Sequence, residues 1–210
     1  MTMITGNGRW LRNLAVALLV GLGLAGALLL AATTQAADAP DTGEPRLQIP
    51  DNIRSGPEST VRVPVILAPA SERIAGLAFP INFDQNCLAL DYRDDDGDGV
   101  PNSIQFTPQP GLRGSVSLRP NDPNAELIFI LADYSPPIAT LNAGPVVTMT
   151  FTTRCAPAAG QNIYAPVRFA ELPRSSFGSP EGGNVPGAIF GGGVLIGDTP
   201  VVEPTATPMP

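Results

Sequence analysis

Hydrophobic side chains recur at every second residue along most of the chain between residues 44 and 198. The pattern is clearest in "STVRVPVIL" and "IAGLAFPINFD", and it continues in "GSVSLRP", "AELIFILAD", "GPVVTMTFTT", "APVRFAE" and "GGVLIG". This period is typical of β-strands with one buried face, and the segments are short and bounded by Gly, Pro, Asn or Asp. In the first two segments, the residues expected to face the core are Val61, Val63, Val65, Leu67, Leu77, Phe79, Ile81 and Phe83.

No helix is predicted in this region, because no long stretch combines a helical hydrophobic stripe with capping residues. The 22 glycines and 24 prolines of the chain separate the strand segments from one another. The pattern therefore predicts an all-β fold, an antiparallel β-sandwich of about eight or nine strands. The segment "SSFGSPEGGNVPGAIFGGG" is rich in glycine and is expected to form a long irregular surface loop before the last strand.

The N-terminal region combines a basic start, an apolar stretch from Leu14 to Ala32, and the small and polar residues "TTQAADAP". This order is typical of a secretory signal peptide, here cleaved after Ala36, although the apolar stretch is also long enough to stay as a membrane anchor. Either interpretation exports the rest of the chain. The predicted organisation is a signal peptide or anchor (1–36), a short linker (37–43), a folded domain (44–198) and a Pro/Thr-rich linker or tail (199–210).

The exported part is acidic and contains no histidine. All 19 acidic residues lie after position 37, whereas two of the 12 basic residues, Arg9 and Arg12, lie before it. A negative surface argues against nucleic acid or an anionic membrane as the partner, because both require clustered positive charge. The absence of histidine excludes Ser–His–Asp and Cys–His catalysis and removes the most common zinc ligand.

The two cysteines, Cys87 and Cys155, lie in a part of the chain that is expected to be exported, where disulfides persist. They allow only one intramolecular pairing. A bridge between them would stabilise the fold by about 4 kcal/mol in the chain-entropy estimate. The alternative is a pair of buried free thiols.

The stretch "RDDDGDGVPNSIQF" places four carboxylates within five positions, from residue 94 to residue 98. Counted from Asp94, it follows the D-x-D-x-D-G pattern of calcium loops, with a glycine at the sixth position, where the chain must turn sharply. The predicted ligands are Asp94, Asp96, Asp98, the carbonyl group of Val100, Asn102 and, weakly or through water, Gln105. Calcium is therefore the expected cofactor, in a structural role.

Two residues of this loop depart from the EF-hand pattern. Gln105 stands where a bidentate Glu is usual, and Pro101 prevents a following helix. The ending "GVPN" instead resembles the calcium-binding repeats of thrombospondin type 3 segments. Asp95 is expected to point away from the ion. A solvated Asp–Gly turn without an ion is the alternative, since Asp and Gly favour turns unaided.

The order of the strand motifs resembles that of cohesin domains, the jelly-roll sandwiches that bind dockerins in cellulosomes and related bacterial assemblies. The resemblance covers nearly all of the folded region and implies the same jelly-roll topology. The motifs that carry it are Val63-Pro64-Val65, Phe83-Asp84 with Leu88, Ala132-Asp133, the strand from Gly144 to Phe151, and the strand from Gly193 to Ile196.

The resemblance also implies a partner-binding face on the strand from Ile74 to Asp84. The outward residues of this strand are expected to be Gly76, Ala78, Pro80 and Asn82. Type I cohesins carry an Asn and an Asp on this strand that bond to the dockerin, and Gly76 and Ala78 take those places here. A dockerin-bearing protein, a different protein partner, and a surface domain with no such partner therefore all remain open.

The sequence thus predicts an exported, non-catalytic binding or scaffolding module that works outside the cell or at its surface. No enzyme activity is expected, since no pair of carboxylates is identifiable as a catalytic pair. A carbohydrate-binding module of polysaccharide degradation is the alternative, because such modules share the jelly-roll fold. The few aromatic residues disfavour it: Trp10 is the only tryptophan, and the exported part adds only Tyr92, Tyr134 and Tyr164.

Overall fold

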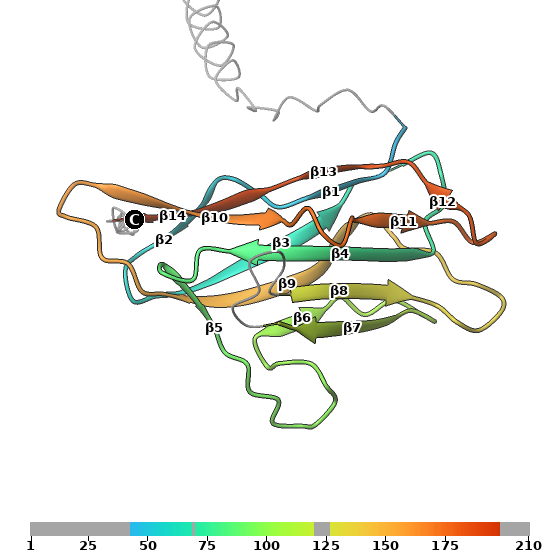
Figure 1. The fold of residues 1–210 in the computed structure, drawn as a ribbon, viewed down its shortest axis with the longest axis horizontal. Coiled ribbons are helices and arrows are strands. Elements are labelled where there is room, and N and C mark those ends of the chain that lie inside the picture. Colours follow the sequence, from blue (N-terminus) through green and yellow to red (C-terminus); the bar gives the residue numbers. More distant parts are fainter. Residues whose placement is uncertain (1–42, 69, 120–126, 198–210) are drawn as a thin grey trace, which may run out of the picture. The chain divides into compact units, whose positions relative to one another are not determined.

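The computed structural model describes residues 43–68, 70–119 and 127–197, and these fold into a sandwich of two β-sheets in which no described residue is helical (Figure 1). The strands are β1 (Arg46–Gln48), β2 (Ile53–Ser55), β3 (Thr60–Leu67), β4 (Gly76–Phe83), β5 (Leu88–Leu90), β6 (Ile104–Phe106), β7 (Arg113–Leu118), β8 (Leu127–Ala132), β9 (Gly144–Thr153), β10 (Asn162–Phe169), β11 (Ser176–Gly178), β12 (Asn184–Val185), β13 (Ala188–Phe190) and β14 (Gly192–Gly197).

The strands form two sheets, here called A and B. Sheet A has the order β13-β1-β3-β9-β5, and β6 also pairs with β9. Sheet B has the order β12-β11-β4-β10-β14-β2, with β8 on β4 and β7 on β8. The predicted all-β sandwich is therefore confirmed. Most pairs are antiparallel, and the two parallel pairs, β1 with β13 and β2 with β14, make both sheets mixed.

Several of these strands are pieces of longer ones. β5 and β6 both pair with β9, and β10 and β11 both pair with β4. β1 and β13 lie together in sheet A, whereas their continuations β2 and β14 lie together in sheet B. When these pieces are counted as single strands, the number of strands is close to the number that the sequence predicts.

The first and last strands switch sheets at the same place, and glycine makes this crossing feasible. A Cβ at Gly192 would collide with the carbonyl oxygens of Ile49 and Pro50. The backbone of one switching strand therefore contacts that of the other directly, and any larger residue at position 192 would force them apart.

The core lies between the sheets, as the alternation predicts. The residues expected to face it are all buried: Val61, Val63, Val65, Leu67, Leu77, Phe79, Ile81 and Phe83. Aromatic rings bridge the strands inside it. Phe79 stacks on Phe129 with ring centroids 5.2 Å apart, and Phe83 contacts Phe151 at 4.9 Å.

The glycine-rich segment before the last strand differs from the prediction, because it is not an irregular loop. It contains β11, β12 and β13, and it buries Phe177 and Val185 in the core. Glycine permits this packing, since a Cβ at Gly187 would lie only 2.5 Å from the ring of Phe177. Glycine here allows close approach and does not prevent strand formation.

The predicted signal peptide or anchor (1–36), most of the linker (37–43) and the C-terminal tail (199–210) lie outside the described residues. Among the described residues, none forms a helix long and apolar enough to cross a membrane.

Cys87 and Cys155 form the predicted disulfide, with their Cα atoms 4.6 Å apart. Cys87 precedes β5 and Cys155 follows β9, and these strands pair with each other from Leu88↔Thr153 onward. The backbone N–H of Arg154 also donates to the carbonyl oxygen of Cys87 at 2.8 Å. The bridge therefore closes the end of a ladder that hydrogen bonds already hold.

We expect the double variant Cys87→Ser, Cys155→Ser to lower the free energy of unfolding by about 2–4 kcal/mol, because it removes a long-range constraint on the unfolded chain. Urea denaturation measures the change. Non-reduced peptide digests of the wild-type protein should contain the linked Cys87 and Cys155 peptides. Two alkylatable thiols in the purified protein would contradict the pairing.

Candidate functional site

The outer face of sheet B is built by the antiparallel pairing of β4 with β8. The register places Gly76 opposite Ala132, Ala78 opposite Ile130, and Pro80 opposite Ile128. Because side chains alternate along a strand, the residues between these positions point into the core, and these six point outward. The structure thus brings the predicted residues of β4 beside a row of apolar residues on β8.

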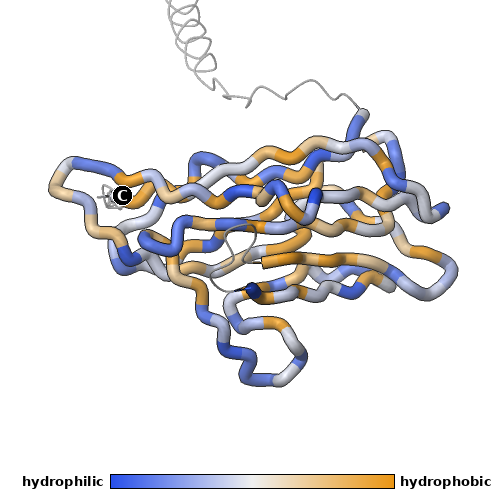
Figure 2. Tube along the Cα trace, viewed as in Figure 1, coloured by the Kyte–Doolittle hydropathy of each residue, from blue (hydrophilic) through white to orange (hydrophobic). Residues whose placement is uncertain are grey.

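The residues on β8 were missed in the sequence, although the signal was present. The strand reads "LIFILA" and has no polar residue at any position, so both of its faces are apolar. Ile130 is 40% exposed, and Ile128 and Ala132 are partly buried. Figure 2 shows β8 in hydrophobic colours along most of its length. We call Gly76, Ala78, Ile128, Ile130 and Ala132 the outer strip.

Polar side chains border the outer strip on β7. Ser115 lies opposite Ile130 and Ser117 opposite Ile128, while Arg113 lies opposite Ala132. All three are exposed. An apolar centre with a polar border is the usual composition of a protein–protein interface.

Pro80 departs from the prediction that it is exposed, because the structure buries it. It lies between Ile128 on β8 and the chain that leaves β10, where the N–H of Ala170 donates to the Pro80 carbonyl oxygen at 3.0 Å. Flanked on both sides, its ring offers little surface to a partner. Asn82, two residues on, is partly buried and lies opposite Arg168 on β10.

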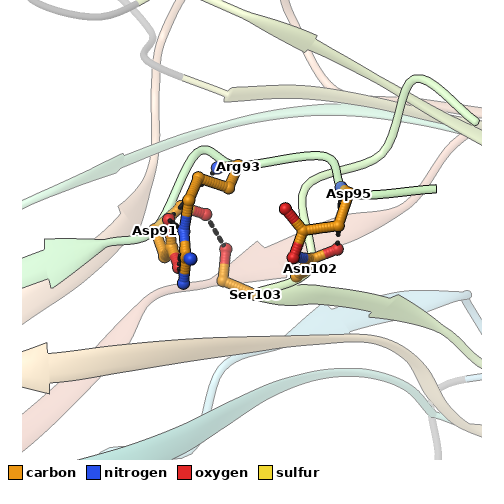
Figure 3. A network of polar contacts seen from close by, with 5 residues as sticks. All are labelled: Asp91, Arg93, Asp95, Asn102 and Ser103. Carbon is orange, nitrogen blue, oxygen red and sulfur yellow. Dashed lines mark hydrogen bonds and ion pairs between the residues drawn. The ribbon is translucent and has the colours of Figure 1, made fainter. Parts of the chain in front are cut away.

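The acidic stretch is an insertion into one strand. β5 and β6 pair with consecutive parts of β9, and residues 91–103 leave the sheet between them (Figure 1). The two ends of the insertion are tied together. The Ser103 hydroxyl donates to the backbone carbonyl oxygen of Asp91 at 2.6 Å (Figure 3). The backbone N–H of Asn102 donates to the backbone carbonyl oxygen of Arg93 at 2.8 Å. We call residues 94–101 the acidic lobe.

The three carboxylates expected to bind calcium lie together. Asp94, Asp96 and Asp98 each offer an oxygen within 4.8 Å of the others. Asp94 accepts hydrogen bonds from the N–H groups of Gly99, at 2.8 Å, and Gly97, at 2.9 Å. Both glycines have positive φ, which lets the chain wrap around this carboxylate.

The remaining predicted ligands, Val100, Asn102 and Gln105, have other contacts in the structure. Asn102 donates from its amide nitrogen to Asp95 at 2.6 Å (Figure 3), so Asp95 points across the lobe and is not one of the three clustered carboxylates. Gln105 lies within β6, opposite Thr148 of β9. Val100 is partly buried against the core, and its N–H donates to Asp98. The sequence spacing does not reveal these contacts, because it does not fix side-chain direction.

Hydrogen bonds in the acidic lobe and at its base lower the pKa values of two carboxyl groups, those of Asp94 and Asp91. The N–H of Gly99, with smaller contributions from the Asp96 side chain and Gly97, lowers the pKa of Asp94 below its usual 3.8. Arg93, which forms an ion pair with Asp91 at 2.6 Å, lowers the pKa of that carboxyl group. Both carboxylates are therefore stabilised in their charged form at neutral pH.

The other carboxylates at strand ends serve turns. Asp84 accepts the N–H of Asn86 at 3.0 Å. Asp133 accepts the N–H groups of Ala139, at 2.8 Å, and Ser135, at 2.9 Å, and these bonds lower its pKa. Each acts as an acceptor that orders the following loop.

No protein-family model matches the chain, and no curated protein is significantly similar to it in sequence. Solved structures are similar in fold. The OlpC cohesin of Clostridium thermocellum, solved in a type I cohesin–dockerin complex, matches with a TM-score of 0.54 at 15% identity, over 73% of this chain and 94% of that one. The domain has a cohesin fold.

Two further cohesins match to a similar extent. The third ScaC cohesin of Acetivibrio cellulolyticus, solved with the ScaB dockerin, has a TM-score of 0.50 at 15% identity and covers 73% of this chain and 97% of that one. The third ScaB cohesin of R. flavefaciens, solved with a group 1 dockerin, has a TM-score of 0.50 at 13% identity, with 74% and 96% covered. The cohesin fold thus accounts for nearly the full length of these neighbours.

The lowered pKa of Asp94 gives the acidic lobe a pH dependence. A carboxyl group with a depressed folded-state pKa stabilises the fold above its unfolded pKa, and this stabilisation is lost as the pH falls through the folded value. We therefore expect the amide resonances of Gly97 and Gly99 to stay constant near neutral pH and to shift in a transition whose midpoint lies below pH 3.8. NMR titration measures this. Asp94→Asn should abolish the transition, whereas a midpoint above 3.8 would contradict the assignment.

Proposed function

We propose that this domain is an exported, non-catalytic scaffolding module that docks a protein partner across the outer face of β4 and β8. The observation that carries the proposal is the outer strip, in which Ala78 and Ile130 lie side by side in a sheet of cohesin fold. The three neighbours described above were solved in complex with dockerins, so a dockerin-bearing protein is the first partner to consider.

The chemistry of the outer strip favours an apolar protein surface. Its residues carry no charge, and the exposed Ile130 forms a ridge beside the lower surface of Gly76 and Ala78. Such a strip buries apolar area against a helix or sheet and offers few hydrogen bonds to a sugar or a reacting group. Since the resemblance places polar contacts of type I cohesins at the positions of Gly76 and Ala78, binding here depends on shape and apolar contact.

We place the module outside the cell or at the cell surface. The N-terminal signal pattern and the disulfide support export, because disulfides form and persist in oxidising compartments. The Pro/Thr-rich C-terminal sequence is suited to a linker that holds the domain away from whatever it is attached to.

We propose further that calcium binds in the acidic lobe through Asp94, Asp96 and Asp98. Three carboxylates held this close repel one another, and a hard cation relieves the repulsion. With Asn102 held by Asp95, the other oxygens would come from the backbone and from water. The ion's role would be to order the insertion, whose base is already closed.

Ala78→Arg and Ile130→Arg should each weaken partner binding by about 2–4 kcal/mol, because a charge would be buried at the centre of the interface. Calorimetry against purified dockerin-bearing proteins from the same genome measures this. The domain should keep its melting temperature, because Ala78 and Ile130 point away from the core.

Thr152→Arg is the matched control for the docking variants. Thr152 is exposed on the outer face of sheet A, opposite Thr60, and should leave binding unchanged. The binding face is misassigned if Thr152→Arg weakens binding as much as Ile130→Arg. The dockerin assignment fails if none of the dockerin-bearing proteins binds the wild type.

Calcium titration of the wild-type protein should give a dissociation constant of about 10⁻⁴ M or weaker, as in extracellular modules. The double variant Asp96→Ala, Asp98→Ala should abolish the heat of binding, because it removes two of the three clustered ligands. Asp95→Asn is the control, since it removes one charge outside the cluster and keeps a partner for Asn102. Equal losses in both variants would indicate diffuse attraction to acidic residues and no defined site.

A further inference from the structure

A second surface of sheet B, on the other side of β4 from the outer strip, is concave and contains an exposed aromatic ring. It lies where β10 and β14 pair and β13 crosses toward β14 (Figure 1). A hollow of about 350 Å³ opens there, lined by Tyr164, Arg168, Phe169, Ile189, Gly191 and Gly192.

Tyr164 leans across the sheet. It pairs with Leu195 of β14, yet a Cβ built at Gly193 would lie 2.7 Å from its Cζ atom and 2.8 Å from its hydroxyl oxygen. The ring therefore extends over the neighbouring strand and contacts bare backbone, which only glycine permits. Gly193 is buried beneath it, while Tyr164 is 45% exposed. One side of the ring rests on the sheet, and the other is open to a ligand.

Arg168 lies on the same outward face of β10, about 13 Å further along the strand. Its side chain is exposed and makes no hydrogen bond or ion pair with any described residue. Arg168 also borders a second hollow of about 410 Å³, which Asn82, Asp84 and Glu171 line on the far side. The two hollows together, here called the β10 groove, offer an aromatic ring, a cation, an amide and two carboxylates.

This set of groups fits an oligosaccharide. A pyranose ring has an apolar flat face that packs on an aromatic ring, and its hydroxyl groups both donate and accept hydrogen bonds. A guanidinium donates to hydroxyl or carboxylate oxygens, and carboxylates accept from hydroxyl groups. The exposed apolar side chains here, Ile189 and Leu172, line different hollows, so a protein partner would not find the continuous apolar area of the outer strip.

We propose that the β10 groove binds a pyranose oligosaccharide, with one sugar ring on Tyr164 and the next ones hydrogen-bonded to Arg168. The site is separate from the outer strip, since β4 lies between them in the sheet order. A single module can therefore hold a glycan and a protein partner at the same time. The proposal goes beyond the proposed docking function and does not depend on it.

Calorimetry and affinity electrophoresis of the purified full-length protein test the proposal, with cellohexaose as the neutral probe and hexagalacturonate as the acidic one. We expect one of them to bind and Tyr164→Ala to weaken that binding roughly tenfold. Tyr164→Phe should retain most of the affinity, because the ring stays. Tyr134→Ala is the matched control, since Tyr134 is 74% exposed and lies outside the groove.

Further variants separate the glycan site from the docking face and keep the test informative. Arg168→Ala should weaken binding even if Tyr164→Ala fails to fold, and a larger loss for hexagalacturonate would identify an acidic sugar. Ile130→Arg should leave glycan binding unchanged. The proposal is overturned if neither probe binds the wild type, if Tyr134→Ala has the same effect as Tyr164→Ala, or if the Tyr164 and Arg168 variants affect only the binding of a protein partner.

Discussion

The antiparallel register between β4 and β8 determines both the core and the outer strip of sheet B. Inside, it places Phe79 against Phe129, with ring centroids 5.2 Å apart. Outside, the same register places Ala78 beside Ile130. A slip of one residue would expose the aromatic pair and bury the strip, so the large energy of burying two phenylalanines also fixes the surface. The outer strip is specified by the core beneath it and not by its own weak contacts.

In the acidic insertion, too, one part of the structure fixes the position of another: the sheet holds the two ends, and the lobe lies between them. β5 and β6 pair with consecutive parts of β9, so the strand resumes in register after residues 91–103 have left it. The contacts of Ser103 with Asp91 and of Asn102 with Arg93 close the base (Figure 3), and the disulfide secures the start of β5. Because the sheet holds both ends, the lobe between them can change in sequence, charge or bound ion without disturbing the pairing with β9. This is why four carboxylates are tolerated within five positions of a small domain.

The inward face of each strand could be predicted from the sequence, whereas the outward faces could not. Burial of Val63 or Phe79 follows from alternation alone, since a sandwich has one core. Exposure depends on neighbours that alternation does not reveal. Pro80 is buried because the chain after β10 lies against it, and Tyr164 leans over the neighbouring strand because Gly193 has no side chain there. Similarly, the spacing of the acidic residues predicted the cluster of Asp94, Asp96 and Asp98, but the pairing of Asp95 with Asn102 depends on how the lobe folds back.

Sheet B presents two different surfaces because its strands have different neighbours on the two sides of β4. Toward β8, pairing is continuous from Gly76 to Ile81, and the outer side chains form a flat strip. On the β10 side, pairing with β10 covers only Ile81 to Phe83 of β4. The chain after β10 then leaves the sheet and pairs with β4 again as β11. That interruption, together with the glycines of the β13–β14 crossing, leaves hollows where side chains would otherwise fill the face. Continuous pairing produces a broad apolar surface, and interrupted pairing produces a narrow, more polar one, so the topology itself divides the outer face of sheet B into two different surfaces.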